Sequence, residues 1–284
     1  RRFIPSAQGM ILVTGPTGSG KTTTLYGALN ELNLPAVKII TVEDPVEYRL
    51  PRINQVQIHS RIDLTFAKVL RSALRQDPDI IMVGEMRDEE TVGIGIRAAM
   101  TGHLVLSTLH TNDAVGTTLR LLDMGTPGYM VASSLRAVVS QRLVRRICPN
   151  CIHPDPLDVA KRNWVKSVLD EPVHSSTFQK GAGCSQCNNT GYQGRIGVFE
   201  LLEIDERLAE ALRSDDTTAF TRAAQQQKGF QPFMHHAMDY ALQGITSLDE
   251  VLRISGQTED FSWETEGELP EAEDHELTSV EAQL

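Results

Sequence analysis

The chain has 284 residues, of which 40% are hydrophobic and 23% charged, and its formal net charge is −10. This length suits one sizeable domain with smaller appendages, and the hydrophobic fraction suffices for a buried core. No apolar run reaches the roughly 18 residues of a membrane helix, and no signal peptide pattern opens the chain, so we expect a cytoplasmic protein. A glycine-rich motif begins as early as Gly15, so the sequence reads as a fragment of a longer protein.

The negative charge is concentrated at the C-terminal end. From Glu259 onward there are ten carboxylates and no Lys or Arg, so the rest of the chain carries 27 acidic and 27 basic side chains. The overall acidity therefore says little about partners. Because residues 257–284 combine one-sided charge with few large apolar side chains, we predict an acidic, disordered tail there.

Short apolar runs alternate with amphipathic segments in the first part of the chain. They predict strands at 10–14, 38–42, 80–83 and 103–107, and helices at 21–32, 66–74 and 89–100. This alternation is typical of parallel β-α units in a sheet covered on both faces, so we predict an α/β fold over residues 1–146. In such sheets the functional groups gather beyond the carboxyl ends of the strands.

The composition changes after Arg146. Cys, Pro, Gly and Asn dominate up to Gly194, which predicts a small module with little regular structure over residues 147–200. Helical patterns follow at 208–227 and 232–243, so residues 201–256 are expected to form a helical C-terminal subdomain. Three arginines, at positions 142, 145 and 146, are expected at the end of a helix that leads into this module. They could cap that helix, contact another subunit, or form a link that carries the nucleotide state to the module.

The segment that joins the first predicted strand to the first predicted helix fits G-x-x-x-x-G-K-[ST]. Glycines let backbone N–H groups surround phosphates, Lys21 reaches the β- and γ-phosphates, and the Thr22 hydroxyl binds Mg²⁺. The N-terminus of the following helix adds its positive end to the same site. The predicted nucleotide-binding residues are Gly15, Pro16, Thr17, Gly18, Ser19, Gly20, Lys21, Thr22 and Thr23.

Acidic residues follow the next two strands. Glu43, Asp44 and Glu47 come after the second strand, and Glu85 lies just past the third. Nucleotide hydrolysis needs a carboxylate near Mg²⁺ and a group that orients the attacking water. An apolar strand with a carboxylate at its tip is the Walker B arrangement. Taken singly, each of these carboxylates could equally be solvated or cap a helix.

Histidines bracket the fourth strand. His103 precedes it and His110 follows it, each near threonines. They could sense the γ-phosphate of a nucleotide, although a lone histidine more often has a structural role.

Four motifs occur in the order GPTGSGKTTTLY, TVEDPVEY, LRQDPDIIMVGEMRD and TGHLVLSTLHTNDA. Together they resemble the Walker A, Asp box, Walker B and His box of the type II secretion and type IV pilus assembly ATPases (the GspE/PulE/PilB family). The resemblance extends from Ile4 to Arg253 and includes the MshE-like ATPases of mannose-sensitive haemagglutinin pili. It implies a RecA-like P-loop NTPase that hydrolyses ATP with Mg²⁺ to drive assembly of a type IV pilus or a type II secretion pseudopilus.

The resemblance also implies partners and residue roles. The full-length protein would be a homo-hexamer on an inner-membrane platform protein, peripheral to the membrane and associated with it only through partners. Glu85 would be the Walker B glutamate, His110 the His-box histidine nearer the nucleotide, and either Glu85 or Glu47 the general base. The remaining residues with implied roles at the site are Lys21, Thr22, Glu43, Asp44 and His103.

One departure from the family pattern concerns an upstream domain that supplies arginines to the phosphates. This sequence does not contain it, so we expect weak ATP binding, slow hydrolysis and no stable ring from this chain alone. Two alternatives to a secretion motor stay open, namely a nucleotide-binding scaffold without turnover and the ATPase of a DNA-transfer or uptake machine.

The four cysteines form two C-x-x-C pairs, Cys148 with Cys151 and Cys184 with Cys187. This spacing lets all four thiolates bind one structural Zn²⁺ in a closed tetrahedral site. Disulfides are disfavoured in a reducing cytosol, and a redox pair would need only one motif. The pairs resemble the tetracysteine motif of assembly and secretion ATPases, which retraction ATPases lack. The intervening segment has no concentrated basic patch, so we expect no direct nucleic-acid partner.

Overall fold

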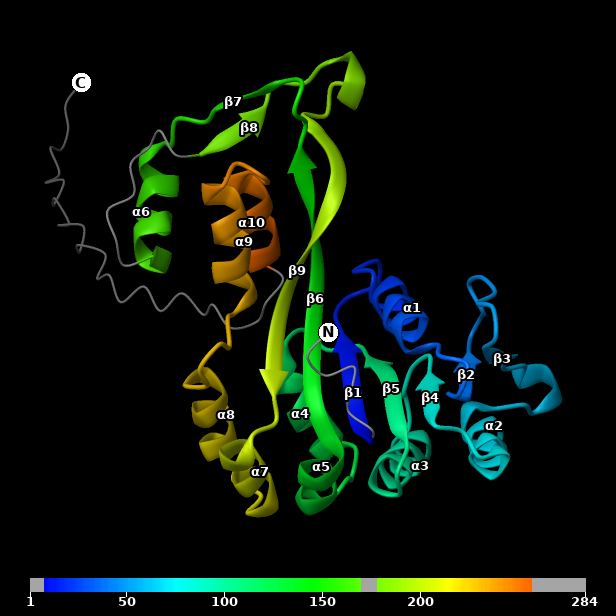
Figure 1. Cartoon of the computed structure of the whole chain (residues 1–284). Coiled ribbons are helices and arrows are strands. Elements are labelled where there is room, and N and C mark those ends of the chain that lie inside the picture. The colour runs from blue at the N-terminus through cyan, green and yellow to red at the C-terminus, as the bar shows by residue number, and fades with distance from the viewer. Residues whose placement is uncertain (1–7, 170–177, 257–284) are drawn as a thin grey trace, which may run out of the picture.

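The computed structural model describes residues 8–169 and 178–256, and the predicted acidic tail lies outside these residues. Seven strands form one sheet in the order β3-β2-β4-β5-β1-β6-β9 (Figure 1). All neighbours in it are parallel except β9, which runs antiparallel to β6 at one edge, so the predicted α/β fold is confirmed. The strands are β1 (Gly9–Thr14), β2 (Ile39–Glu43), β3 (Asn54–Gln57), β4 (Ile80–Val83), β5 (Leu104–Leu109), β6 (Leu135–Ile147) and β9 (Tyr192–Glu203).

Helices connect these strands, and two short strands form a separate hairpin near the tip of β6. The α-helices are α1 (Lys21–Leu32), α2 (Phe66–Ala73), α3 (Glu89–Met100), α4 (Ala114–Asp123), α5 (Gly128–Ser134), α6 (Val159–Leu169), α7 (Glu206–Arg213), α8 (Thr217–Gln225), α9 (Phe233–Leu242) and α10 (Leu248–Ser255). The remaining elements are β7 (Ile152–Pro154), β8 (Gln179–Gly181) and the 3₁₀ turns η1 (Ser60–Ile62), η2 (Leu74–Gln76) and η3 (Ser185–Cys187).

Strand β1 is buried on both faces. Its side chains alternate, so Met10 and Leu12 join the core beneath α3, α5 and α7, whereas Ile11 and Val13 pack on the other face against α1. Continuous apolar character in a strand follows from this two-sided covering. The strands and helices predicted between residues 10 and 107 begin within about one residue of those in the structure.

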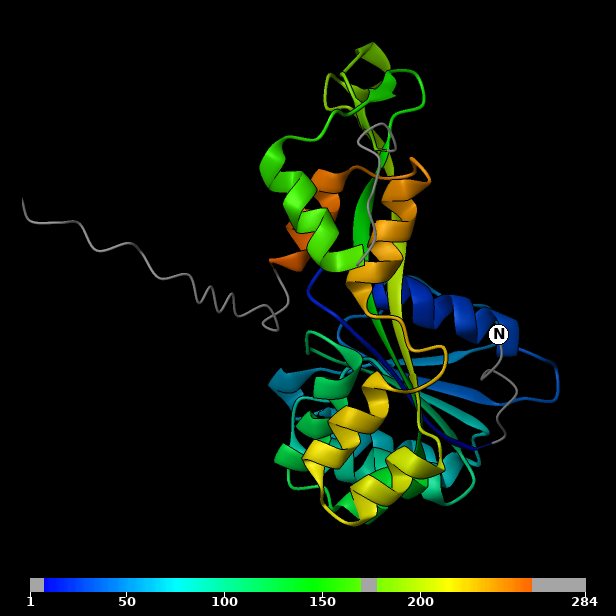
Figure 2. The same cartoon turned by 90° about the vertical axis from the view of Figure 1, so that its left-hand side faces the viewer.

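Strand β6 extends well beyond the end of β1 and, with β9, forms an arm that supports a second core (Figure 2). Val144 and Val198 of the arm pack with Phe178, with Val165 of α6, and with buried side chains of α9 and α10. The four cysteines lie around the tip of the arm, next to the β7–β8 hairpin. No helix in the described ranges has the combined length and hydropathy needed to cross a membrane.

The helices that follow β9 are divided between the two cores. Helices α7 and α8 pack beneath the main sheet, whereas α9 and α10 pack on the arm, so residues 201–256 are not one packing unit. The predicted helix 208–227 is also two helices. Asp215 adopts φ 53°, and the Asp216 side chain accepts the backbone N–H of Ala219 to start α8.

The expectation that Arg142, Arg145 and Arg146 end a helix is wrong, because all three lie on β6. The segment is rich in valine and leucine, and its side chains alternate between the two faces of a strand, which favours extended structure. Arg142 is 2% exposed, whereas Arg145 and Arg146 are exposed.

Candidate functional site

The loop between β1 and α1 is braced from behind by β6. Gly15 adopts φ 139°, and a Cβ atom there would lie 2.2 Å from the carbonyl oxygen of Gln141. The Gln141 side-chain amide donates to the carbonyl of Ser19 (2.6 Å) and accepts from the hydroxyl of Thr24 (2.6 Å). The loop therefore contains the glycine that its close approach to β6 requires. The buried Gln141 side chain of β6 fixes the shape of the loop.

Lys21 begins α1 and carries the positive charge of this loop. Its Nζ donates to the carbonyl oxygens of Gly15 (2.8 Å) and Pro16 (3.1 Å). Burial lowers the pKa of Lys21, and the nearby charge of Glu85 opposes that shift. An ammonium held among loop carbonyls at the start of a helix is well placed to exchange those contacts for phosphate oxygens.

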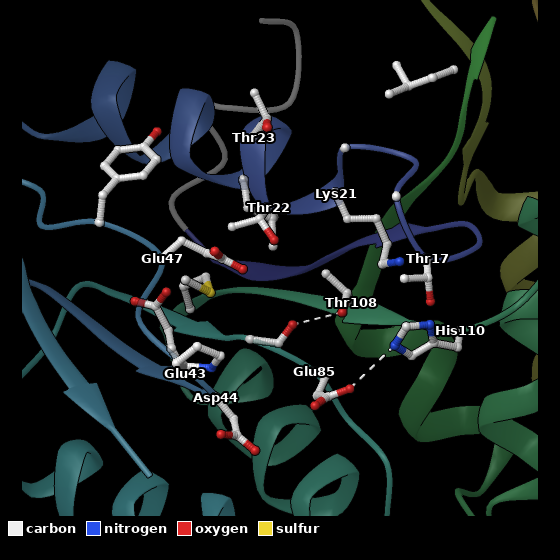
Figure 3. Close-up of a pocket in the computed structure, with 18 of the residues that line it drawn as sticks. Thr17, Lys21, Thr22, Thr23, Glu43, Asp44, Glu47, Glu85, Thr108 and His110 are labelled. Atoms are coloured by element: carbon white, nitrogen blue, oxygen red, sulfur yellow. Dashed lines mark hydrogen bonds and ion pairs between the residues drawn. The ribbon is translucent and has the colours of Figure 1, made fainter.

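A cavity of about 740 Å³ lies in front of this loop (Figure 3). Because β1, β2, β4 and β5 are parallel, the segments that follow all four strands meet at one edge of the sheet. The predicted site residues that line the cavity are Thr17, Gly18, Gly20, Lys21, Thr22, Thr23, Glu43, Asp44, Glu47, Glu85 and His110. Gly15, Pro16 and Ser19 belong to the same loop but do not line the cavity.

Glu85 lies just past the end of β4 and faces His110 across the cavity floor (Figure 3). Its Oε2 is 3.4 Å from Nε2 of His110 and 2.7 Å from Nε of Arg87, and its side chain is only 12% exposed. The Thr108 hydroxyl of β5 donates to the carbonyl of Gly84, which fixes the strand end that carries Glu85. The arrangement places one carboxylate between two nitrogen donors next to the phosphate-binding loop.

The three carboxylates that follow β2 have different surroundings. Glu43 is 3% exposed and accepts hydrogen bonds from the Tyr26 hydroxyl, the Thr41 hydroxyl and the Gln55 amide (3.2 Å). Burial and the Glu43 charge raise the pKa of Tyr26 well above its ordinary value.

Asp44 and Glu47 are exposed on the cavity wall. Hydrogen-bond donors already occupy both oxygens of Glu43, so its side chain is held in one position. Asp44 and Glu47 are accessible to a ligand.

His103 is not brought to this site. It precedes β5, its carbonyl accepts the backbone N–H of Gly9 at the start of β1, and its ring lies 3.0 Å from the carbonyl of Ala98. The length of β5 separates it from His110 by roughly 20 Å. His103 therefore lies away from this cavity, at the end of α3, and does not line it as we expected.

Nine further residues line the cavity without having been predicted as site residues, among them Arg87, Leu143 and Arg195. Arg87 follows Glu85 by two positions, so its proximity was recoverable from the motif. Leu143 comes from β6, which runs parallel beside β1, and Arg195 comes from β9, which pairs antiparallel with β6. No local signal in the sequence indicates that contact.

The four cysteine sulfurs lie within 4.8 Å of one another. The separations are 3.9 Å for Cys148–Cys184, 3.9 Å for Cys151–Cys187 and 3.8 Å for Cys184–Cys187. A tetrahedral site with Zn–S bonds of about 2.3 Å has sulfurs about 3.8 Å apart, so the cluster fits such an ion. The backbone N–H groups of Cys184 and Gly191 donate to the Cys187 sulfur (3.2 and 3.3 Å), and such donors favour a thiolate.

The family model of type II/IV secretion system proteins matches residues 1–253. The chain belongs to this family. It is 47% identical over 260 residues to the type II secretion system ATPase E of Vibrio cholerae, covering 91% of this chain and 50% of that protein. It is 44% identical over 250 residues to the type IV pilus assembly ATPase TfpB of Acinetobacter baylyi, covering 88% and 42%. The chain thus spans about half the length of these curated relatives.

Solved structures agree with this secretion-family assignment. The pilus retraction motor PilT with bound ADP has a TM-score of 0.66 at 30% identity, covering 89% of this chain and 63% of PilT. The Legionella pneumophila ATPase DotB has a TM-score of 0.65 at 26% identity, covering 90% and 62%. The predicted family and RecA-like fold are confirmed, and the finer resemblance to MshE-like ATPases stays a prediction.

Proposed function

We propose that this chain is the ATP-hydrolysing unit of a motor that assembles a type IV pilus or a type II secretion pseudopilus. The observation that carries the proposal is the single cavity in which the phosphate-binding loop, the acidic segment after β2, Glu85 and His110 meet. Relatives named as a secretion ATPase and a pilus assembly ATPase support the same conclusion.

Each group in the cavity has a role in that reaction. Lys21 would bind the β- and γ-phosphates, and Thr22 would hold Mg²⁺, which would supply charge that neutralises the developing phosphate charge. Glu85 would hold the metal or its water, and the exposed carboxylates of Asp44 and Glu47 would be available to orient the attacking water. His110, next to Glu85, is placed to respond when the γ-phosphate is lost.

The motor would act as a hexamer of the full-length protein. Subunits of such a ring change their relative angle as ATP is consumed, and an inner-membrane platform protein would follow that movement from the cytoplasmic side. Support comes from the likeness to named secretion and pilus motors. We propose that contact with the membrane is made only through such partners, with no direct role for nucleic acid.

We infer that the cysteine cluster holds Zn²⁺. Four thiolates at tetrahedral separations form a closed site, which leaves no coordination position for a substrate. The ion would fix the turn after β6 to the turn before β9 and so stiffen the tip of the arm. Its role would therefore be structural.

The function is tested by ATP binding and phosphate release with Lys21→Ala and Glu85→Gln variants. Lys21→Ala should lose ATP affinity because the phosphate charge is no longer matched. Glu85→Gln should keep ATP affinity and lose about 100-fold or more in turnover, the usual size of the effect when one catalytic group is removed.

A matched control for the second variant is Glu90→Gln, which changes a surface glutamate paired with Arg71 on α2. It should behave as the unsubstituted chain in both assays. Equal phosphate release from the unsubstituted chain and Glu85→Gln, with ATP binding intact, would mean that the protein is a nucleotide-binding scaffold and not a motor.

A further inference from the structure

Two buried side chains of opposite charge lie on the same face of the arm. Arg142 of β6 is 2% exposed and Glu200 of β9 is 5% exposed. Arg142 is opposite Val198, and Glu200 is opposite Ser140, so the two charged residues are diagonal neighbours across the antiparallel pair. Neither lines the nucleotide cavity.

Both side chains are directed at the same short segment of backbone. Nη2 of Arg142 donates to the carbonyl of Asn112 (2.8 Å), and Oε1 of Glu200 accepts the N–H of Ala114 (2.8 Å). Asp113, between them, is the N-cap of α4 and accepts the N–H of Gly116 (2.6 Å). Two neighbouring strands therefore hold the backbone on either side of this cap.

The same segment carries His110 into the nucleotide cavity. Residues 110–113, here called the His110 loop, are also tied to β1, because the Thr111 and Thr14 hydroxyls lie 2.5 Å apart. Thr14 is the last residue before the phosphate-binding loop. The loop thus spans from the cavity floor, where His110 meets Glu85 at 3.4 Å, to the charged pair on the arm.

The pair is not optimised as an ion pair. Within the described part of the chain, Nε and Nη1 of Arg142 have no hydrogen-bond partner, and the guanidinium instead lies 4.9 Å from the ring centroid of Phe233 on α9. Burial raises the pKa of Glu200 to about 7, although N–H donors at Ala114 and Phe233 and the charge of Arg142 oppose the rise.

Buried charges with unused donors are costly for stability. Their presence here is better explained by the elements that they connect, which are the His110 loop, the arm and α9.

We propose that Arg142 and Glu200 form a clamp through which the β6–β9 arm positions the His110 loop against Glu85. The proposal rests on the proposed ATPase function and adds a connection to it. Through this clamp, the arm that ends in the cysteine cluster sets the position of His110 in the nucleotide cavity. Arg142 and Glu200 are positioning residues, because they act through the loop and do not touch the cavity.

Arg142→Met tests this clamp, since methionine keeps the aliphatic bulk beside Phe233 and removes the donors. Loss of one charge-assisted hydrogen bond should lower kcat about tenfold. The KM for ATP should change by less than about twofold, because the phosphate-binding loop is untouched. Arg146→Met is the matched control, an exposed arginine on the same strand, and it should leave both constants unchanged.

Amide hydrogen exchange gives a readout that does not depend on turnover. Arg142→Met should speed exchange in residues 110–116 selectively and leave α1 and α10 unaffected. Glu200→Gln keeps an oxygen acceptor for Ala114, so exchange there should change less. Glu200→Leu removes that acceptor and should speed exchange in residues 110–116, and it serves as a second variant if Arg142→Met does not fold.

Unchanged exchange in residues 110–116 would overturn the clamp, as would a rise spread evenly over both cores or a parallel loss of ATP affinity and kcat. Absence of turnover in the unsubstituted chain would refute the proposed function instead, and the exchange result would still decide the clamp.

Discussion

The buried carboxyl of Glu200 makes the stability of the fold depend on pH, and Glu200→Gln should remove that dependence. Burial raises its pKa from an ordinary value of 4.5 to about 7 in the folded chain. Between these two values the folded state keeps a proton that the unfolded state has released. The carboxyl therefore stabilises the fold most at low pH, and this contribution is lost as the pH rises through about 7.

The size of the effect follows from the two pKa values. At pH 6 most folded molecules hold the proton and few unfolded ones do, which is worth about 1.5 kcal/mol, and at pH 8.5 the contribution is close to zero. Urea unfolding at a series of pH values in this range measures it, and the range also stays above the isoelectric point near 5.3. The free energy of unfolding of the unsubstituted chain minus that of Glu200→Gln should fall by about 1.5 kcal/mol from pH 6 to 8.5.

Glu90→Gln serves as control, because Glu90 is an exposed surface residue whose replacement should leave the pH profile unchanged. If the profiles of the unsubstituted chain and Glu200→Gln run parallel across this range, the carboxyl is already ionised at pH 6. The argument that burial dominates its surroundings would then be wrong.

Three other substitutions test separate parts of the fold. Cys184→Ser should reduce bound zinc from about one ion per chain to none, as measured by elemental analysis, and should loosen the arm before the main sheet in hydrogen exchange. Gly128→Ala should lower the free energy of unfolding, measured with urea, by about 3 kcal/mol. The added Cβ would lie 2.0 Å from the carbonyl of Leu212 and force α5 away from α7. Glu43→Gln should lower the free energy of unfolding by about 2 kcal/mol, because the new amide N–H₂ would face donors that now bind the carboxylate. ATP affinity, measured by titration, should stay unchanged.

Local patterns in the sequence predicted the part of the site that follows the parallel strands. Lys21 and Thr22 begin the helix that follows β1, and Glu85 follows β4. The apolar runs of both strands are short and clearly bounded, and parallel strands bring the segments that follow them together. The same rule separates the two histidines. A residue that follows β5 reaches this edge, whereas His103 precedes β5 and lies at the opposite edge.

Contacts that depend on β6 and β9 were beyond reach of local patterns. The arginines in β6 resemble the basic end of a helix, but the β-branched residues Val138, Val139 and Val144 in the same segment favour a strand. Gln141 reaches the phosphate-binding loop because β6 pairs beside β1, and Arg195 reaches the cavity because β9 pairs with β6. The cysteines were predictable because metal geometry restricts their spacing more tightly than packing restricts an apolar side chain.

Strand β6 links the nucleotide cavity to the tip of the arm in a way that suits a motor. Adjacent residues of β6 contact two different loops of the cavity, Gln141 at Ser19 and Arg142 at Asn112. From there the strand continues for about 20 Å to Ile147, next to the cysteine cluster. A rotation of about 6° at Gln141 would move that end by about 2 Å. We expect that any change in the spacing of these two loops would be carried along β6 toward the cysteine cluster, because both contacts lie on adjacent residues of one strand.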